Sequence, residues 1–115
     1  ETGYIVAIIS NLTIDQGSTF TANIDCTALD GNILNLTGYS VAGQLRKTYD
    51  SSTKTDFTAA IANALTGRLT ISLSATQTNT LAAGRYVYDV EITDGGGIVT
   101  RVVEGQVEIT PGVTK

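Results

Sequence analysis

The sequence predicts an all-β fold for a single domain over residues 1–115, an antiparallel β-sandwich of about seven strands with one short helical turn. Apolar and polar residues alternate with a period of two along most of the chain, as they do in strands that bury one face. The composition agrees, because the chain is rich in Val, Ile and especially Thr, with 19 residues, and these suit a pleated, half-buried surface. No helical stretch of about 10–15 residues separates the strands, so we expect the sheets to be antiparallel.

The first three strands are expected in the N-terminal half of the chain. One lies within Tyr4–Ile14, as part of an N-terminal strand or arm over residues 1–18. Two more follow at residues 19–28 and 39–47, separated by a turn at Asp30–Gly31. The alternation places these residues on their buried faces: Phe20, Ala22, Ile24, Cys26 and Ala28, and then Tyr39, Val41, Gly43 and Leu45.

Two further strands and the helical turn are expected next. In the segment from residue 74 to residue 84, Ser74 and Gln77 have the spacing of a capping box, and Gly84 stands where a short helix would stop. The threonines between them are poor helix formers, so we expect a single turn. The strands at 57–62 and 68–74 are expected to bury Phe57, Ala59, Ile61, Leu69, Ile71 and Leu73.

The last two strands form a hairpin between Gly84 and Ile109. The glycine-rich turn Asp94–Gly97 can adopt the positive φ that hairpins require. The return strand changes phase, which predicts a β-bulge between Val102 and Gly105. The first strand places Tyr86, Tyr88, Val90 and Ile92 on one face and Arg85, Val87, Asp89, Glu91 and Thr93 on the other. Seven short alternating strands in about a hundred residues are typical of an immunoglobulin-like sandwich.

The composition argues against several classes of function. Seven basic and eleven acidic residues give a net charge of −4, which disfavours binding to nucleic acid or to a membrane surface. The chain has no His and a single cysteine, Cys26, so most metal sites and acid–base arrangements lack their usual residues. Asp89, Glu91 and Asp94 could line a calcium site, but charges on the outer face of a strand are expected in any case. We therefore predict no catalytic, cofactor-binding or metal-binding residues, and no enzyme.

One segment departs from the alternation. The run "YIVAII" at Tyr4–Ile9 supplies apolar side chains to both faces, although a strand at the surface of a sandwich should be polar on one side. Val87 adds an apolar residue to the expected outer face of its strand. Either the N-terminal segment is tucked into the domain and switches sheets, or a neighbouring subunit covers this patch. The second interpretation predicts assembly contacts at Ile5, Ile8, Ile9 and Val87.

Three phrases of the sequence carry a family resemblance: "NLTGYSVAGQLRK" at Asn35–Lys47, "TGRLTISLSATQT" at Thr66–Thr78, and "AGRYVYDVEITDGGGIVTRVVEGQVEITPGVT" at Ala83–Thr114. They resemble an immunoglobulin-like domain of virion structural proteins in tailed bacteriophages, of the baseplate, tail or capsid-associated type, which is frequent in marine and cyanobacterial phages. The resemblance runs from about Phe20 to Thr114, and its last segment is the most specific. The family pattern contributes turn and core residues and no catalytic ones.

The resemblance implies a non-enzymatic structural module of a virion, in the capsid decoration, neck, tail or baseplate. Its partners would be other virion proteins and further copies of the same chain, as a homo-oligomer or lattice, assembled in the host cytoplasm. The alternative is a surface-displayed adhesin or carbohydrate-binding module that recognises a host glycan. In that case the loops Thr48–Asp56 and Asp94–Gly97 would carry recognition, with Tyr49 as their one aromatic residue.

Overall fold

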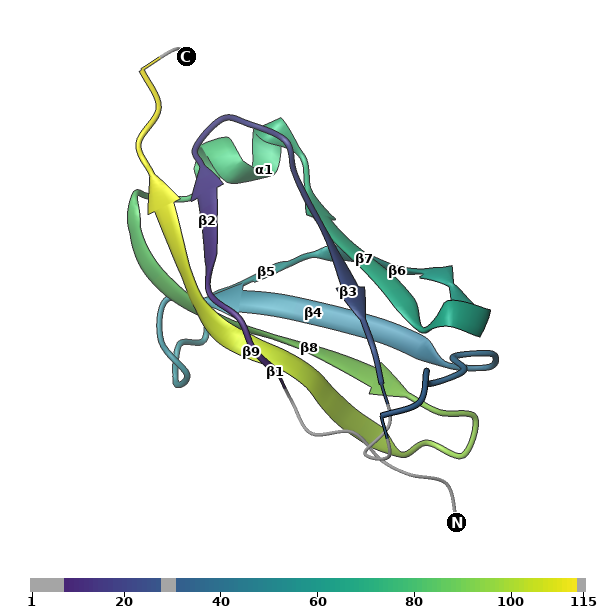
Figure 1. Ribbon diagram of the computed structural model, residues 1–115. Helices are drawn as coiled ribbons and strands as arrows, with labels where there is room; N and C mark the ends of the chain where they lie inside the picture. Colours follow the sequence, from purple (N-terminus) through teal and green to yellow (C-terminus); the bar gives the residue numbers. More distant parts are fainter. Residues whose placement is uncertain (1–7, 28–30, 114–115) are drawn as a thin grey trace.

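A computed structural model describes residues 8–27 and 31–113 and confirms the predicted fold class, an all-β sandwich (Figure 1). Within these residues the chain forms nine strands and two short helical segments. The elements are β1 (Ile8–Ile9), β2 (Leu12–Asp15), β3 (Phe20–Asp25), β4 (Ser40–Arg46), β5 (Lys54–Asp56), β6 (Thr58–Asn63), the 3-10 helix η1 (Ala64–Thr66), β7 (Arg68–Leu73), α1 (Ala75–Thr80), β8 (Gly84–Thr93) and β9 (Val99–Thr110).

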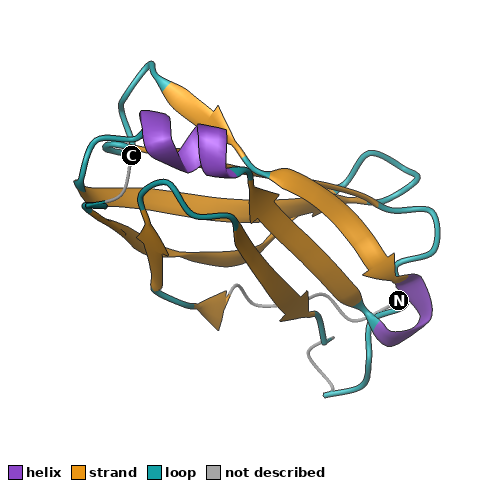
Figure 2. Ribbon diagram, turned by 90° about the horizontal axis from the view of Figure 1, so that it is seen from above, coloured by secondary structure: helices purple, strands orange, loops and turns teal. Residues whose placement is uncertain are grey.

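The described strands form two sheets that face each other. The larger sheet has the order β1-β9-β8-β4-β5, with β2 also paired to β9, and the smaller sheet has the order β3-β7-β6. The chain passes from the larger to the smaller sheet at Phe57, between β5 and β6, where the Phe57 N–H donates to the Gly43 carbonyl at 2.9 Å. The helical segments η1 and α1 lie at opposite ends of the sandwich (Figures 1 and 2).

The N-terminal strands differ from expectation in their direction. Most pairs are antiparallel as predicted, but β1 and β2 both run parallel to β9. A short turn forces antiparallel pairing only between strands that are neighbours in sequence. Because β1 and β2 lie at the opposite end of the chain from β9, no such turn constrains them. They add to the free edge of the larger sheet, and the side chain of Ile14 from β2 is buried in the core.

The interruption between β1 and β2 depends on Gly105 of β9. A Cβ atom at Gly105 would lie only 2.2 Å from the Ser10 carbonyl oxygen, so only glycine lets the N-terminal segment approach here. Tyr88 pairs with Gly105, and its hydroxyl reaches across to donate to the Ser10 carbonyl at 2.6 Å. The Asn11 side chain accepts from the Gln106 N–H at 3.0 Å. These contacts fix the point where β1 ends and β2 begins.

The predicted β-bulge is present in β9. Val90 pairs with Val103 and the next residue of β8, Glu91, pairs with Arg101, so Val102 is the additional residue. It lies at one end of the predicted range. The bulge lets two consecutive side chains, Val102 and Val103, both point into the core.

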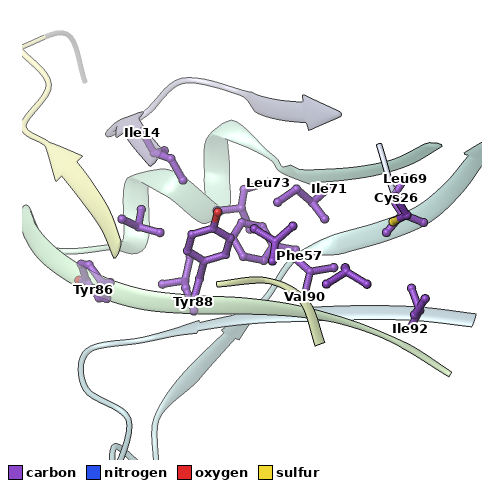
Figure 3. Close-up of a cluster of buried hydrophobic side chains, with 14 of the residues drawn as sticks. Ile14, Cys26, Phe57, Leu69, Ile71, Leu73, Tyr86, Tyr88, Val90 and Ile92 are labelled. Carbon is purple, nitrogen blue, oxygen red and sulfur yellow. The ribbon is translucent and has the colours of Figure 1, made fainter. Parts of the chain in front are cut away.

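The core lies between the sheets (Figure 3). Most of the residues that alternation assigned to it are buried there, whereas seven are only partly buried and pack against it: Phe20, Ala22, Ile24, Tyr39, Val41, Ala59 and Ile61. Phe57 packs edge-on against Tyr88, with ring centroids 6.0 Å apart, and Phe20 lies next to Phe57. Two loop residues also belong to the core, Leu36 and Leu81, and the sequence pattern did not predict them. The buried apolar side chains of the described residues are Ile14, Cys26, Leu36, Leu45, Phe57, Leu69, Ile71, Leu73, Leu81, Tyr86, Tyr88, Val90, Ile92, Val102, Val103, Val107 and Ile109. Ala28, which alternation also assigned to the core, lies outside the described residues.

The predicted capping box forms at the start of α1. Ser74 accepts from the Gln77 N–H at 3.1 Å, and the Gln77 side chain accepts from the Ser74 N–H at 2.9 Å. The helix ends at Thr80, four residues before the predicted stop at Gly84, which instead begins β8. The buried Thr78 hydroxyl ties α1 to the β2–β3 turn, because it donates to the Ser18 carbonyl and accepts from the Gly17 N–H.

Candidate functional site: the outer face of the larger sheet

The alternation that fills the core also defines a polar surface on the far side of the larger sheet. The register aligns outward residues of β4, β8 and β9 in rows: Asp89 lies between Gln44 and Glu104, and Glu91 lies between Ala42 and Arg101. We call this surface the charged face. It comprises Ala42, Gln44, Arg46, Val87, Asp89, Glu91, Arg101 and Glu104, with Ile9 beside Glu104 on β1.

The charged face is hollowed at its centre. A depression of about 460 Å³ lies over β4, β8 and β9, next to the loop between β4 and β5. Ala42 and Gly43 are among its lining residues, and the small Ala42 side chain on the outward side of β4 leaves space that a larger residue would fill. Tyr49, which is 73% exposed, stands at its rim on the β4–β5 loop. The depression is therefore a shallow, open surface feature.

Two arginines organise the charges of this face. Arg101 Nε lies 3.3 Å from Asp89 Oδ2, and its Nη1 lies 3.4 Å from Glu104 Oε1, so one guanidinium holds two carboxylates. Arg46 donates to the Ser51 carbonyl and to Gln44 Oε1, which directs its guanidinium along the rim of the depression. With Glu91, the lining has three carboxylates and two guanidinium groups, close to electrical balance. Such a surface can pair its charges with those of a partner.

The predicted assembly contacts fall partly on this face. Ile9 is 75% exposed, and Val87 is half-buried on the outward side of β8. Ile8 takes its place in β1 opposite Val103, and Ile5 lies outside the described residues. The structure thus places Ile9 and Val87 on one surface, and their role in contacts stays a prediction.

Acidic residues near the β8–β9 turn serve the local structure. Asp94 Oδ1 accepts from the backbone N–H groups of Gly96 and Ile98, at 2.8 and 2.9 Å, so this carboxylate shapes the turn. In the part of the chain that the structure describes, no group of three or more His, Cys, Asp or Glu side chains is placed to hold a metal ion. The same residues contain no helix long and apolar enough to cross a bilayer.

Cys26 is a core side chain. It is buried at the end of β3, and burial, with the charge of Asp25 as a smaller cause, raises the pKa of its thiol from 9.0 to about 11. The thiol is therefore protonated at neutral pH and is a poor nucleophile.

Several exposed apolar residues outside the charged face were missed by the sequence reading. Ile33 lies near Gly67 and Leu65 lies in η1, at one end of the sandwich, while Ile98 lies in the β8–β9 turn and Val99 is the first residue of β9. The signal that could have found Leu65 is the absence of charge from Phe57 to Gly67, which leaves the large apolar side chains of this stretch without charged neighbours in sequence.

No protein-family model matches the chain, and no curated protein matches it. Among solved structures, the chain is similar to an internalin-like protein of Listeria monocytogenes, with 18% identity and a TM-score of 0.44. That match covers 92% of this chain and 28% of the other, so the chain spans little more than a quarter of that protein. It is also similar to the major subunit of the type I aggregative adherence fimbriae of Escherichia coli, with 14% identity, a TM-score of 0.41 and 89% of each chain covered. Neither likeness says what this chain does.

Proposed function

We propose that this domain is a non-enzymatic structural module that acts through protein–protein assembly contacts, and that the charged face is one of its contact surfaces. The observation that carries the proposal is the position of Ile9, a large apolar side chain 75% exposed on the same face as Val87 and the Arg101 ion pairs. Apolar side chains beside balanced charges are the ingredients of a protein–protein interface. The virion setting comes from the sequence resemblance.

The composition is consistent with this role. The chain lacks His, and Cys26 is buried with a raised pKa, so two of the usual nucleophile and acid–base groups are missing. A rigid sandwich with an ordered core needs no chemistry to act as a building block. Partners would be other virion proteins or copies of the same chain.

Light scattering over a concentration series tests the proposal directly. Val87→Arg and Ile9→Asp place new charges on the charged face, and we expect both to lower the native mass relative to the unaltered chain. Ile98→Asp is a matched control for Ile9→Asp, because it charges an apolar residue that is also largely exposed, at 66% against 75%, in the β8–β9 turn. Unchanged mass in the two face variants would contradict the proposal for this surface.

A second candidate function is favoured by Tyr49. Its ring stands 73% exposed at the rim of the depression, above charged groups that can hydrogen-bond the hydroxyls of a sugar. This arrangement supports a surface-displayed binding module. A glycan array compares the unaltered chain with Tyr49→Ala: hits that the variant loses would support carbohydrate recognition, and an array without hits would count against it.

A further inference from the structure

We propose that the free edge of β6 pairs antiparallel with β6 of a second copy of this chain, which joins two three-stranded sheets into one. The inference builds on the proposed assembly function and names the partner. It concerns the smaller sheet, away from the charged face, so the two surfaces can be tested separately.

One edge of the smaller sheet, at β6, is open. The smaller sheet has the order β3-β7-β6, and among the described residues β6 pairs with β7 alone (Figure 2). Its other side presents backbone N–H and C=O groups that a further strand can bind. The outward side chains of β6, at Thr58, Ala60 and Ala62, are small and exposed, so another backbone can approach closely.

The edge strand β6 carries no charge. Edge strands are normally protected from pairing by charged side chains or proline. Among the other edge strands of the described residues, β2, β3 and β5 each carry at least one charge, at Asp15, at Asp25 and at Lys54 with Asp56, and β1 is only two residues long. By contrast, β6 has neither a charge nor a proline, and the uncharged stretch extends from Phe57 to Gly67.

The flanks of this edge are electrically balanced as well. Lys54 pairs with Asp56 at 2.9 Å before the strand, and Arg68 pairs with Asp25 at 2.8 Å beyond it. On a chain with a net charge of −4, two copies repel each other over most of their surface. A neutral strip is where they can meet, and antiparallel pairing of β6 with itself brings no like charges together.

Two exposed apolar side chains lie near the end of the strand. η1 follows β6 directly and carries Leu65, which is 72% exposed. Ile33, 59% exposed, lies near Gly67, which follows η1 directly. Antiparallel pairing about a twofold axis carries the start of β6 in one copy toward Leu65 and Ile33 in the other, which adds apolar burial to the backbone hydrogen bonds.

A register shift limits the length of the pairing. The pairing of β6 with β7 shifts between Ile61 and Asn63, which bends the strand near its end. The straight part, Thr58–Ile61, is therefore the segment that pairs, with Ala60 close to the twofold axis. A charge placed at Ala60 meets its own copy there, and like charges directly opposite each other are destabilising in a sheet.

Complementary charge variants test the inference. We expect Ala60→Lys and Ala60→Glu each to lose association through β6, and an equimolar mixture of the two to regain it, because Lys then faces Glu. Thr21→Lys is the matched control, an outward exposed residue on β3 at the opposite edge of the same sheet, and should behave like the unaltered chain. Thermal unfolding of each variant checks that it folds.

The outcomes separate this interface from the charged face. If both surfaces act, Ala60→Lys leaves a dimer through the charged face, Val87→Arg leaves a dimer through β6, and the double variant is a monomer. Two results would overturn the β6 pairing: a mixture of the two Ala60 variants whose native mass stays low, or a loss of association in Thr21→Lys as large as in Ala60→Lys. Either result would leave the charged face open to its own test. An unaltered chain that stays monomeric at every concentration would overturn both.

Discussion

The two outer faces of this sandwich are built on the same alternation and yet differ in character. Across the larger sheet, the charged face gathers five charged side chains around a depression. Across the smaller sheet, the outward residues of β3, β6 and β7 are mainly Thr, Ser, Asn and Ala, with the Arg68–Asp25 ion pair at one end. The outer face of the larger sheet is charged and hollowed. The outer face of the smaller sheet is flat and nearly neutral, and it ends at an open edge.

The difference shows where the sequence is free to vary. Inward residues of both sheets are constrained by close packing, so the two inner faces resemble each other. Outward residues are not constrained by close packing, so the two sheets differ mainly in their outward residues. We infer that the charged face selects partners by electrostatic complementarity, and that the edge of the smaller sheet extends the structure by backbone pairing.

The largest expected effect on stability comes from a substitution that disrupts the larger sheet alone. Gly105→Val puts side-chain atoms where the Ser10 carbonyl lies and disrupts the hydrogen bond from Tyr88. We expect a loss of about 3 kcal/mol in the free energy of unfolding, measured by urea denaturation. Amide exchange should accelerate in β1, β2 and β9 and stay slow in β7.

A glycine in the hairpin turn is the control for this change. Gly95 has no neighbouring atom within 4 Å of an added Cβ and no positive φ, so Gly95→Ala should be close to neutral. Equal losses in the two glycine variants would show that the close approach of Ser10 has no special weight.

The second effect concerns the link between the sheets. Thr78→Val keeps the shape of a buried side chain and removes the hydroxyl that serves Gly17 and Ser18, in the turn between β2 and β3. Because those backbone groups lose a buried partner, we expect a cost of about 2 kcal/mol in thermal or urea unfolding. Thr80→Val is the control, since Thr80 is exposed and water can replace its hydrogen bond to Gln77. A neutral Thr78→Val would contradict this account.

Local patterns predicted those parts of the fold that local physics determines. A period of two follows from strand geometry, so it correctly assigned Phe57, Leu69 and Tyr88 to the core, and the capping box at Ser74 needs only two residues three positions apart. Leu36 escaped because its burial depends on a distant backbone partner, its N–H donating to the Ala64 carbonyl. The parallel pairing of β2 was not predicted for the same reason, because its partner β9 is distant in sequence.

The candidate site was predictable only in fragments. Alternation placed Val87 on an outward face, and the apolar run at Tyr4–Ile9 drew attention to Ile9. The depression depends on the register of β4, β8 and β9, which brings Asp89, Arg101 and Glu104 together from different strands. No single-strand pattern contains that register. The open edge of β6 likewise becomes visible only when the order of the strands is known.

The third effect is a loss of stability in alkali that is absent at neutral pH. It comes from Cys26, at the end of β3 in the smaller sheet. The Cys26 thiol has a pKa of about 11 in the folded chain and 9.0 without burial, so its contribution to stability is complete below pH 9 and is lost as the pH rises through 11. The pKa of Tyr88 is also raised by burial, which extends the loss in alkali. Stability measured against pH should therefore fall more steeply in the unaltered chain than in Cys26→Ala. If stability fell equally steeply with pH in both chains, the raised pKa of Cys26 would be contradicted.

The smallest effect on stability is expected at the charged face, at Arg101. Its guanidinium is half exposed, so Arg101→Gln should change the free energy of unfolding by about 0.5 kcal/mol or less. The same change leaves Asp89, Glu91 and Glu104 facing a partner with only Arg46 to balance them, so assembly through this face should weaken, most clearly at low salt. Association through β6 should be unaffected, because Arg101 lies on the other sheet. A variant that unfolds more easily and assembles normally would make Arg101 a structural residue and remove the charged face from the proposal.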